Sequence, residues 1–371
     1  MKSKILVLVL SSLMSVAYAG PVFYGEIDVS VDYLPENNST RSDRDVWEMS
    51  SNSSYLGIKG EEKLSDRLSA VYLSEWSINA DGDGTDWGQR NRFVGLKDSQ
   101  WGTIKFGKHD TSVKQLSSPV DTFNNYAANK ADIGSILPGE NRIDNAVVYE
   151  SPSLKMFNGT IKFNSLFATG EASGIKQTNG GSKVAGRGFG DSWSAAVTYD
   201  NSFLMAGLGY DKAIPSLFLG RGFLNSSDPE LGVAPASADN FAAANIIRAI
   251  GRVNPLDGFF IKALIQSAEV EDALGNGVLA STIDSSDGWL IGAEYNLPNL
   301  QKWTIKGQYS QNSTSFKNAS DDFNAKQIMV GGDYAFNKQV KAYGYLGYLT
   351  LDQADNKDKQ SLAGLGLEYK F

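Results

Sequence analysis

The chain ends in Ser361-Leu-Ala-Gly-Leu-Gly-Leu-Glu-Tyr-Lys-Phe371, where apolar residues alternate with polar or small ones. Successive side chains of a β-strand point to opposite faces. One face therefore carries Ala363, Leu365, Leu367, Tyr369 and Phe371, and the other carries Gly364, Gly366, Glu368 and Lys370. The first face suits lipid and the second suits water. A strand that closes a barrel in an outer membrane has this pattern, because its lipid-facing apolar band ends in aromatic residues.

The N-terminus predicts export. Lys2 and Lys4 precede the apolar run 5–10, and the segment ends in Ala17-Tyr18-Ala19. This order is typical of a secretory signal peptide, and the run is too short for a membrane-spanning helix. We expect residues 1–19 to be removed and 20–371 to form the mature domain. Loss of two lysines lowers the formal charge from −8 to −10, so no basic footprint for nucleic acid is present.

The composition favours one continuous membrane sheet. The chain has no cysteine, so disulfides cannot stabilise it in an oxidising compartment. The longest later apolar segment, 241–250, is too short to span as a helix and carries Arg248. The 38 glycines, 16 tyrosines and 18 phenylalanines of the chain are spread evenly along it, with no linker between two halves. If the protein crosses a membrane, it crosses as strands.

Alternation along the chain predicts an all-β, antiparallel transmembrane barrel. Segments of about ten alternating residues, joined in turn by short turns and long polar loops, are typical of such barrels. An even number lets both ends meet on one side, and about 16 strands leave an aqueous channel. We expect 16 strands, at 22–33, 47–60, 67–78, 87–97, 101–108, 142–150, 159–167, 192–199, 203–210, 239–253, 259–268, 289–296, 303–310, 325–336, 339–351 and 360–371.

Two stacked sheets or a propeller also contain many short strands, but their apolar residues face inward. Neither explains the signal peptide or the regular alternation of long loops with short turns along the chain. Neither explains the polar residues that stand between apolar strand neighbours, namely Lys162, Lys262, Glu294 and Lys306.

The alternation breaks between His109 and Asn141. This segment holds Leu116, Phe123 and Ile136 among other apolar residues, too many for a free linker. A loop of this length is usually functional or disordered. We expect residues 109–141 to pack on another part of the protein.

Several motifs resemble the trimeric general-diffusion porins of Gram-negative outer membranes. The resemblance covers about the first 150 residues and the last ten. The middle of the chain matches only in its succession of strands, short turns and long loops. It rests on Phe23-Tyr24-Gly25, Leu56-Gly57-Ile58-Lys59-Gly60-Glu61, Arg92-Phe93-Val94-Gly95-Leu96-Lys97, Gly102-Thr103-Ile104-Lys105-Phe106-Gly107, Arg142-Ile143-Asp144-Asn145, Tyr149-Glu150-Ser151-Pro152 and the terminal Tyr369-Lys370-Phe371.

The resemblance implies a homotrimer in the outer membrane, in contact with lipid and lipopolysaccharide, that passes small hydrophilic solutes. It also implies that the third loop, 109–141, folds into the lumen and that its acids face basic residues on the wall. Opposite charges across a water-filled gap would orient dipolar solutes. An arginine facing lipid near the midplane would cost roughly 2 to 4 kcal/mol, so wall arginines are expected to face the lumen or lie near an interface. The constriction candidates are Arg90, Arg92, Lys105, Arg142, Glu26, Glu75 and Asp144 on the wall and Asp121, Asp132 and Glu140 in the loop.

The chain departs from the enterobacterial members of that family. Glu26 and Tyr55 stand where those members carry basic residues, and Leu137-Pro138-Gly139-Glu140 replaces their Pro-Glu-Phe-Gly motif. The selectivity of the family therefore does not transfer. Acidic groups in place of basic ones favour cations.

No pattern for catalysis, a cofactor or a metal site emerges. The only imidazole, His109, precedes Asp110-Thr111-Ser112 in the loop-like region, where a pore or packing role fits better than a nucleophile's base. Gly207-Leu-Gly209 and Gly364-Leu-Gly366 lack a following helix, so they more often allow close packing. The run Asp81-Gly-Asp83-Gly-Thr-Asp86 departs from calcium-loop spacing and is typical of an extracellular loop.

Three functions remain open from the sequence. The first is a porin for passive diffusion of ions and small hydrophilic solutes. The second is a substrate-specific channel, for example for oligosaccharides, lined by aromatics such as Tyr24, Tyr55 and Trp47. The third is a barrel that serves as an adhesin or surface anchor and has a plugged lumen.

Overall fold

The computed structural model describes residues 20–33, 47–127, 131–169, 175–176, 182–183, 189–219, 241–271, 280–318 and 321–371. The expected signal peptide, 1–19, lies outside these ranges, and its removal stays a prediction. Within these ranges, no helix is both long enough and apolar enough to cross a membrane.

Strands make up most of the described chain. One short α-helix, α2 (Ser112–Ser117), and two 3-10 turns, η1 (Ile133–Ser135) and η3 (Ala280–Thr282), interrupt them. The strands are β1 (Val22–Tyr33), β2 (Trp47–Ser51), β3 (Tyr55–Lys63), β4 (Leu68–Ser77), β5 (Gly88–Asp98), β6 (Gly102–Asp110), β7 (Arg142–Glu150), β8 (Leu154–Met156), β9 (Gly159–Ala168), β10 (Ile175–Lys176), β11 (Ser182–Lys183), β12 (Ser192–Asp200), β13 (Leu204–Leu217), β14 (Phe241–Leu256), β15 (Phe259–Val270), β16 (Ile283–Asn296), β17 (Trp303–Phe316), β18 (Phe323–Ala335), β19 (Val340–Gln353) and β20 (Asn356–Lys370).

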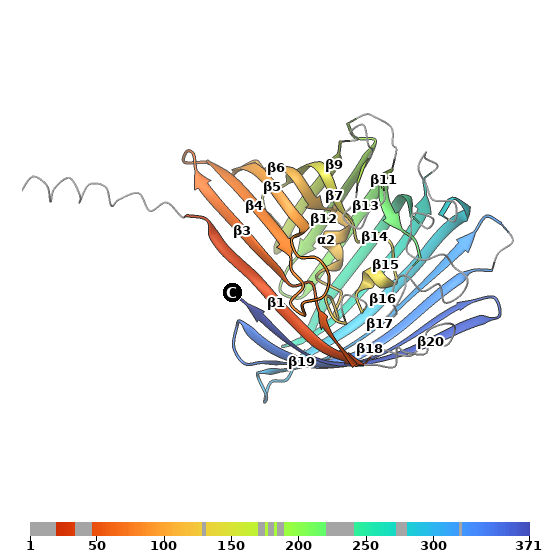
Figure 1. Cartoon of the computed structure of the whole chain (residues 1–371). Helices are drawn as coiled ribbons and strands as arrows, with labels where there is room; N and C mark the ends of the chain where they lie inside the picture. Colours follow the sequence, from red (N-terminus) through yellow and green to blue (C-terminus); the bar gives the residue numbers. More distant parts are fainter. Residues whose placement is uncertain are drawn as a thin grey trace, which may run out of the picture.

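The strands close into one antiparallel barrel (Figure 1). Its sheet has 18 segments, but β2 and β3 both pair with β1, and β7 and β8 both pair with β9. Each of these two pairs is one interrupted strand, which leaves 16. The barrel closes where β1 meets β20, from Glu26 opposite Lys370 to Tyr33 opposite Ala363. The predicted strand number and closure are confirmed, and an open sandwich or propeller is excluded.

The two faces of the wall differ as the alternation predicts. On β1, Glu26, Asp28, Ser30 and Asp32 are at most 5% exposed, whereas Phe23 is 59% exposed. On β20, Leu365 and Leu367 are exposed and Glu368 is buried. Since the exposed apolar side chains lie on one face of every such strand, this face is the outside of the barrel, and the polar face lines the lumen.

Aromatic pairs lie on the outer face near the strand ends. The rings of Phe23 and Phe371 are 5.9 Å apart, and those of Trp303 and Tyr334 are 4.9 Å apart. Such pairs are expected where a barrel meets the membrane interface. Trp47 belongs to this face, because its ring lies 5.5 Å from that of Tyr33 and is 63% exposed. The expectation that Trp47 lines the lumen is therefore wrong.

Several strands are longer than their alternation suggested. β13 continues to Leu217, β16 starts at Ile283 and β17 runs to Phe316. The extensions of β16 and β17 carry polar residues on both faces, as in the Ser-Gln-Asn-Ser-Thr stretch 310–314. Above the apolar band the outward side chains no longer need to be apolar, so the alternation fades while the backbone pairing continues.

Candidate functional site

The long loop, residues 111–141, follows β6, which extends to Asp110. Thr111 caps α2 by accepting a hydrogen bond from the Lys114 amide at 3.2 Å, a common way to start a helix. The helix packs against β12, β13 and β14, and Figure 1 shows it within the ring of strands. Apolar loop side chains such as Leu116, Phe123 and Ile136 are at most 2% exposed. The apolar content that predicted a packed loop is thus buried.

Two glycines of β13 make room for the helix. A Cβ atom on Gly209 would lie 2.7 Å from Leu116 Cδ1 and 3.3 Å from Val113 Cγ2. A Cβ atom on Gly207 would lie 2.8 Å from Leu116 Cδ2. The close-packing interpretation of Gly207-Leu-Gly209 is confirmed.

Arg248 of β14 binds both ends of the loop. Its side chain is fully buried, and its Nη1 donates to Glu140 Oε1 at 2.5 Å and to the Val113 carbonyl at 3.1 Å. Its Nη2 donates to the Pro138 carbonyl at 3.0 Å, and its Nε donates to Gln266 at 2.7 Å. One guanidinium therefore joins the descending and the returning arm of the loop to the wall.

The middle of the loop is attached on β17, β18 and β19. The hydroxyl of Tyr126 donates to Asp333 at 2.8 Å and accepts from Lys306, which also pairs with Asp333 at 3.0 Å. The Tyr126 ring lies 4.5 Å from that of Tyr343 and 5.2 Å from that of Tyr345. Aromatic pairs at such distances add stability beyond their buried area.

The three loop acids bind partners within the loop or on the covered strands. Asp121 accepts from the Ile133 amide at 3.0 Å and from Gln308 at 3.2 Å. Asp132 accepts from the Asn125 amide at 2.6 Å. The second oxygen of Glu140 accepts from Ser117 at 2.9 Å. In the described contacts, none of the three acids forms an ion pair with Arg90, Lys105 or Arg142.

Burial raises the pKa of Asp132 well above its ordinary value, and the nearby charge of Asp121 adds to this. Burial also raises the pKa of Asp121. A carboxyl with a raised pKa binds protons more readily in the packed state than in water. The packed loop is therefore favoured as the pH falls toward the ordinary pKa, and this advantage is lost as the pH rises through the raised pKa.

We expect the stability of the packed loop to fall as the pH rises above the ordinary pKa of an aspartate and through the raised pKa of Asp132. Asp132→Asn should flatten this dependence, because the amide does not titrate. Thermal unfolding in detergent and channel current noise, both recorded against pH, measure the effect. Asp257→Asn, in an exposed turn, is the matched control. An equal pH slope in the wild type and Asp132→Asn would contradict the assignment.

The loop contacts leave part of the inner wall open. Above its base at Asp110, the described polar and ring contacts of the loop reach β9 and β12 to β19. We call the inner face of β1, β3, β4, β5 and β6 the open wall. There Arg90 Nε lies 3.6 Å from Glu75 Oε2, and Lys105 pairs with Glu150 of β7 at 2.6 Å.

Arg142 lies at the base of the loop, beside the open wall. Its Nε donates to Asn91 at 2.8 Å and to Asp110 at 3.0 Å, and Lys114 of α2 also pairs with Asp110 at 3.1 Å. The electrostatic interactions of Arg142 extend to Arg90 and Glu75. The structure thus brings together Arg90, Glu75 and Arg142 of the predicted set.

Arg92 departs from the prediction. It lies over the ring of Trp76 at 5.2 Å, whereas Arg90 lies over Tyr55 and contacts Glu75. Glu75 and Trp76 are consecutive in β4, so they point to opposite faces. A register shift between Ser74 and Trp76 inserts an extra residue into β5 and breaks the alternation. Arg92 lies before this shift, in unbroken register with the exposed Val94 and Leu96, so it faces outward, and the inserted residue brings Arg90 to the lumen face.

Asp144 follows Arg92 to the outer face. It pairs at 2.6 Å with Lys108, the residue opposite Arg92 in the β5–β6 ladder. A second register shift between β6 and β7, with Asn145 at φ 54°, explains the change of side. The prediction of a lumen position was wrong for both residues. Asp144 changes side because of a bulge, which cannot be read from alternation, whereas Arg92 has the same parity as the outward Val94.

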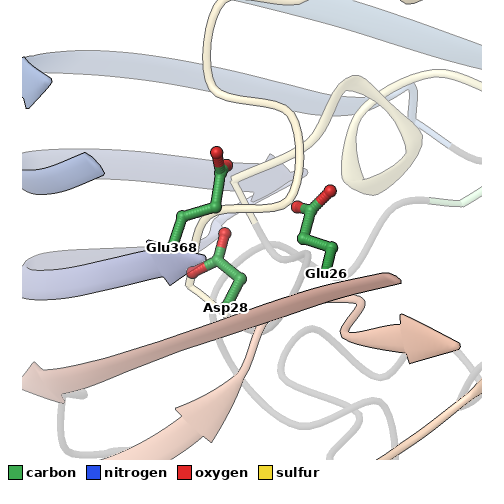
Figure 2. Close-up of side chains that lie close together, drawn as sticks. All are labelled: Glu26, Asp28 and Glu368. Carbon is green, nitrogen blue, oxygen red and sulfur yellow. The ribbon is translucent and has the colours of Figure 1, made fainter. Parts of the chain in front are cut away.

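Glu26 lies farther along the open wall, in a group of three buried carboxylates with Asp28 and Glu368 (Figure 2). Lys341 pairs with Glu368 at 2.9 Å, and Lys370 lies 2.9 Å from Glu368 and 3.6 Å from Glu26. Two lysines thus offset most of the negative charge. We interpret the group as part of the charged lumen wall.

Sequence reasoning missed Arg248, Lys306 and Tyr126 as residues that place the loop. A signal existed for Arg248, since an arginine within the apolar segment 241–250 is costly unless it is paired. No signal identified its partners, because Val113, Pro138 and Glu140 are more than 100 residues away in the chain.

A closed barrel with an apolar outer face and a polar lumen crossed by a packed loop defines an outer-membrane channel. A family model described as Gram-negative porin matches residues 5–356. The chain belongs to this family and forms an outer-membrane channel for passive diffusion.

The chain is 25% identical over 381 residues to the major outer membrane protein P.IB of Neisseria gonorrhoeae, with both chains fully covered. It is 28% identical over 411 residues to the major outer membrane protein P.IA of Neisseria meningitidis serogroup B, again with full coverage. Among solved structures, the outer membrane channel DcaP of Acinetobacter baumannii aligns with a TM-score of 0.63 at 15% identity, covering 96% of this chain and 99% of that one. Salmonella typhi OmpF aligns at 0.62 and 14%, covering 95% and 97%. These structures support the fold.

Proposed function

We propose that the channel is a general-diffusion pore whose narrowest part lies between the long loop and the open wall. The observation that carries this proposal is the attachment of the loop along β12 to β19, through Arg248 at its two ends and Tyr126 in its middle. The loop occupies lumen space on one side only. Solutes then pass along the side lined by Arg90, Glu75 and Lys105.

The charges beside this passage are mixed. Arg90, Lys105, Arg142 and Lys114 supply cations, and Glu75, Asp110 and Glu150 supply carboxylates. We assign the loop acids Asp121, Asp132 and Glu140 mainly to holding the loop. In this assignment the charged residues of the open wall set the ion preference of the channel. Pairs of opposite charges that face each other across the channel, one on the loop and one on the wall, do not.

Replacing Arg90 and Arg142 together by alanine should shift the reversal potential toward cations, because two of the positive groups beside the passage are removed. Purified protein in a planar bilayer under a salt gradient measures the shift. Arg67→Ala, which removes an exposed arginine that pairs with Asp98 at 3.0 Å in a short turn, is the control. An unchanged reversal potential in the double variant would remove these arginines from the constriction.

We propose that the protein is a homotrimer, supported by the outer face of β5 and β6. Arg92 and Lys108 lie there beside the exposed apolar residues Val94 and Phe106. Lys108 is nearly buried and paired with Asp144, but an arginine that faces lipid near the midplane costs about 2 to 4 kcal/mol. A neighbouring subunit that covers this face would remove that cost. Conductance steps in groups of three would support the trimer, and independent single steps would oppose it.

Two other functions make different predictions in the same bilayer. An adhesin or anchor with a plugged lumen would show no conductance. An oligosaccharide channel would be blocked by a sugar but not by unrelated solutes. Lys59 lies 4.2 Å above the ring of Tyr24, and Arg90 lies 4.7 Å from that of Tyr55, so a cation already stacks on each lumen ring. We therefore favour general diffusion over a sugar track.

We propose no enzymatic role for the chain. His109 contacts the Lys105 ammonium at 3.4 Å and the Asp110 carbonyl at 2.9 Å, and its ring lies 5.5 Å from that of Phe93. These contacts suit a packing residue of the wall. We also propose that the outer face of the barrel contacts lipopolysaccharide in the outer membrane.

A further inference from the structure

Five side chains of the open wall form one connected group. Tyr24 donates from its hydroxyl to Glu75 at 2.6 Å, and its ring meets that of Tyr55 edge-on at 6.1 Å. Arg90 lies over the Tyr55 ring at 4.7 Å and 3.6 Å from Glu75. Lys59 lies over the Tyr24 ring at 4.2 Å. The group comes from β1, β3, β4 and β5, away from the strands to which the loop is attached.

The guanidinium of Arg90 has unused hydrogen-bonding capacity. Its Nε is buried and has no hydrogen-bond partner among the residues that the structure describes. Glu75, at 3.6 Å, is beyond the usual distance of 2.7 to 3.2 Å for such a bond. The side chain as a whole is 22% exposed, so a solute can reach the outer part of the guanidinium, although not the buried Nε. Arg142, which interacts electrostatically with Arg90, adds a second cation at this site.

The chemistry of the group selects planar anions. Arg90 and Lys59 against the carboxylate of Glu75 leave one positive charge. Glu26, opposite Tyr55 in the β1–β3 ladder, adds a carboxylate that Lys370 offsets at 3.6 Å. A guanidinium is flat, binds carboxylates through two parallel hydrogen bonds and stacks on aromatic rings. Because Tyr55 lies on one side of Arg90, a second flat group can continue the stack from the lumen. A sugar offers neither the charge nor the flat surface.

We propose that Tyr24, Tyr55, Glu75 and Arg90 form a subsite for planar organic anions, of which aromatic carboxylates are the simplest. The ring of the solute lies on the face of the Arg90 guanidinium opposite Tyr55. Its carboxylate is held by the positive charges of Arg90 and Arg142. The subsite rests on the proposed function, since a solute reaches it only through an open channel. It makes the pore favour one class of solute without tight binding.

Two acids of equal charge and similar size test the proposal. Benzoate is flat, whereas cyclohexanecarboxylate is not. Each is added to wild-type protein in a planar bilayer under potassium chloride, and the concentration that halves the current is measured. Stacking and cation–π contacts of about 0.5 to 1 kcal/mol correspond to a two- to fivefold difference, so benzoate should act at about a two- to fivefold lower concentration.

Variants separate the site from general charge effects. Arg90→Lys keeps the charge but loses the flat guanidinium, and Tyr55→Leu removes the ring beneath it, so each should bring the ratio of the two concentrations close to one. The matched control is Arg252→Lys, because Arg252 lies 5.9 Å from the Phe260 ring and 3.6 Å from Asp200, a similar arrangement on β14. This control should keep the wild-type ratio.

Each outcome decides between the proposals. Equal action of the two acids on the wild type would overturn the subsite while leaving the diffusion channel intact. A ratio lost equally in Arg252→Lys and Arg90→Lys would also overturn it, because the effect would not be local. A wild type without any ion conductance would instead overturn the proposed function.

Discussion

Arg248→Met is expected to destabilise the protein and widen its channel. The substitution removes the hydrogen bonds to Val113, Pro138 and Glu140 and leaves the Glu140 carboxylate without its cation. Breaking a buried ion pair by removing one partner costs about 3 to 5 kcal/mol. Because both arms of the loop lose their attachment, the single-channel conductance should rise. Unfolding in detergent and bilayer recording measure the two effects.

Two further variants make this result specific. Glu140→Gln combined with Arg248→Met removes the unpaired charge and should recover part of the lost stability, since the penalty comes mainly from the partly buried, uncompensated carboxylate. Arg252→Met removes another lumen arginine of β14, whose side chain is 31% exposed and 3.6 Å from Asp200. It should have a small effect on stability. Wild-type conductance in Arg248→Met would show that Arg248 does not hold the loop.

Gly209→Val should displace α2 from the wall. The new Cβ would lie 2.7 Å from Leu116 and 3.3 Å from Val113, and both residues are buried. Overpacking of a filled core costs about 1 to 3 kcal/mol, so the helix is expected to move toward the lumen and lower the conductance. The change in conductance is therefore opposite in sign to that of Arg248→Met. Single-channel recording distinguishes a narrowed from a widened passage.

Leu116, which the new side chain at position 209 would contact, provides the control for this prediction. Leu116→Ala should restore conductance in the Gly209→Val background, because it removes the side chain that the valine meets. Gly251→Val is the matched substitution on β14, where an added Cβ would have no atom within 4 Å. If Gly209→Val and Gly251→Val behaved alike, close packing at Gly209 would not determine the position of the helix.

The barrel could be predicted because its pattern is local. Each strand needs one face that suits lipid and one that suits water. Side chains that alternate between the two faces meet this requirement within about ten consecutive residues. Residues 361–371 and 22–33 show it almost without exception. The burial of the loop was also predictable from its apolar content, although its contacts were not.

The candidate site was predicted less completely. Arg90 and Arg142 lie together near Glu75, but Arg92 and Asp144 face outward. One inserted residue in a strand reverses the side of every residue beyond it. Neither bulge has a marker in the sequence as clear as alternation itself. Arg90 and Arg92 were therefore assigned to one face, although the inserted residue of β5 separates them.

The sequence by itself determined that this chain forms a barrel with an apolar outer face and a polar inner face, because strand periodicity is a property of neighbouring residues. Only the tertiary structure decided where the loop lies. Arg248 meets Val113, and Tyr126 meets Asp333, across more than 100 residues of chain. Such contacts depend on how the sheet closes, which brings strands distant in sequence to face one lumen. The side of the lumen that stays open for solutes is a consequence of that closure.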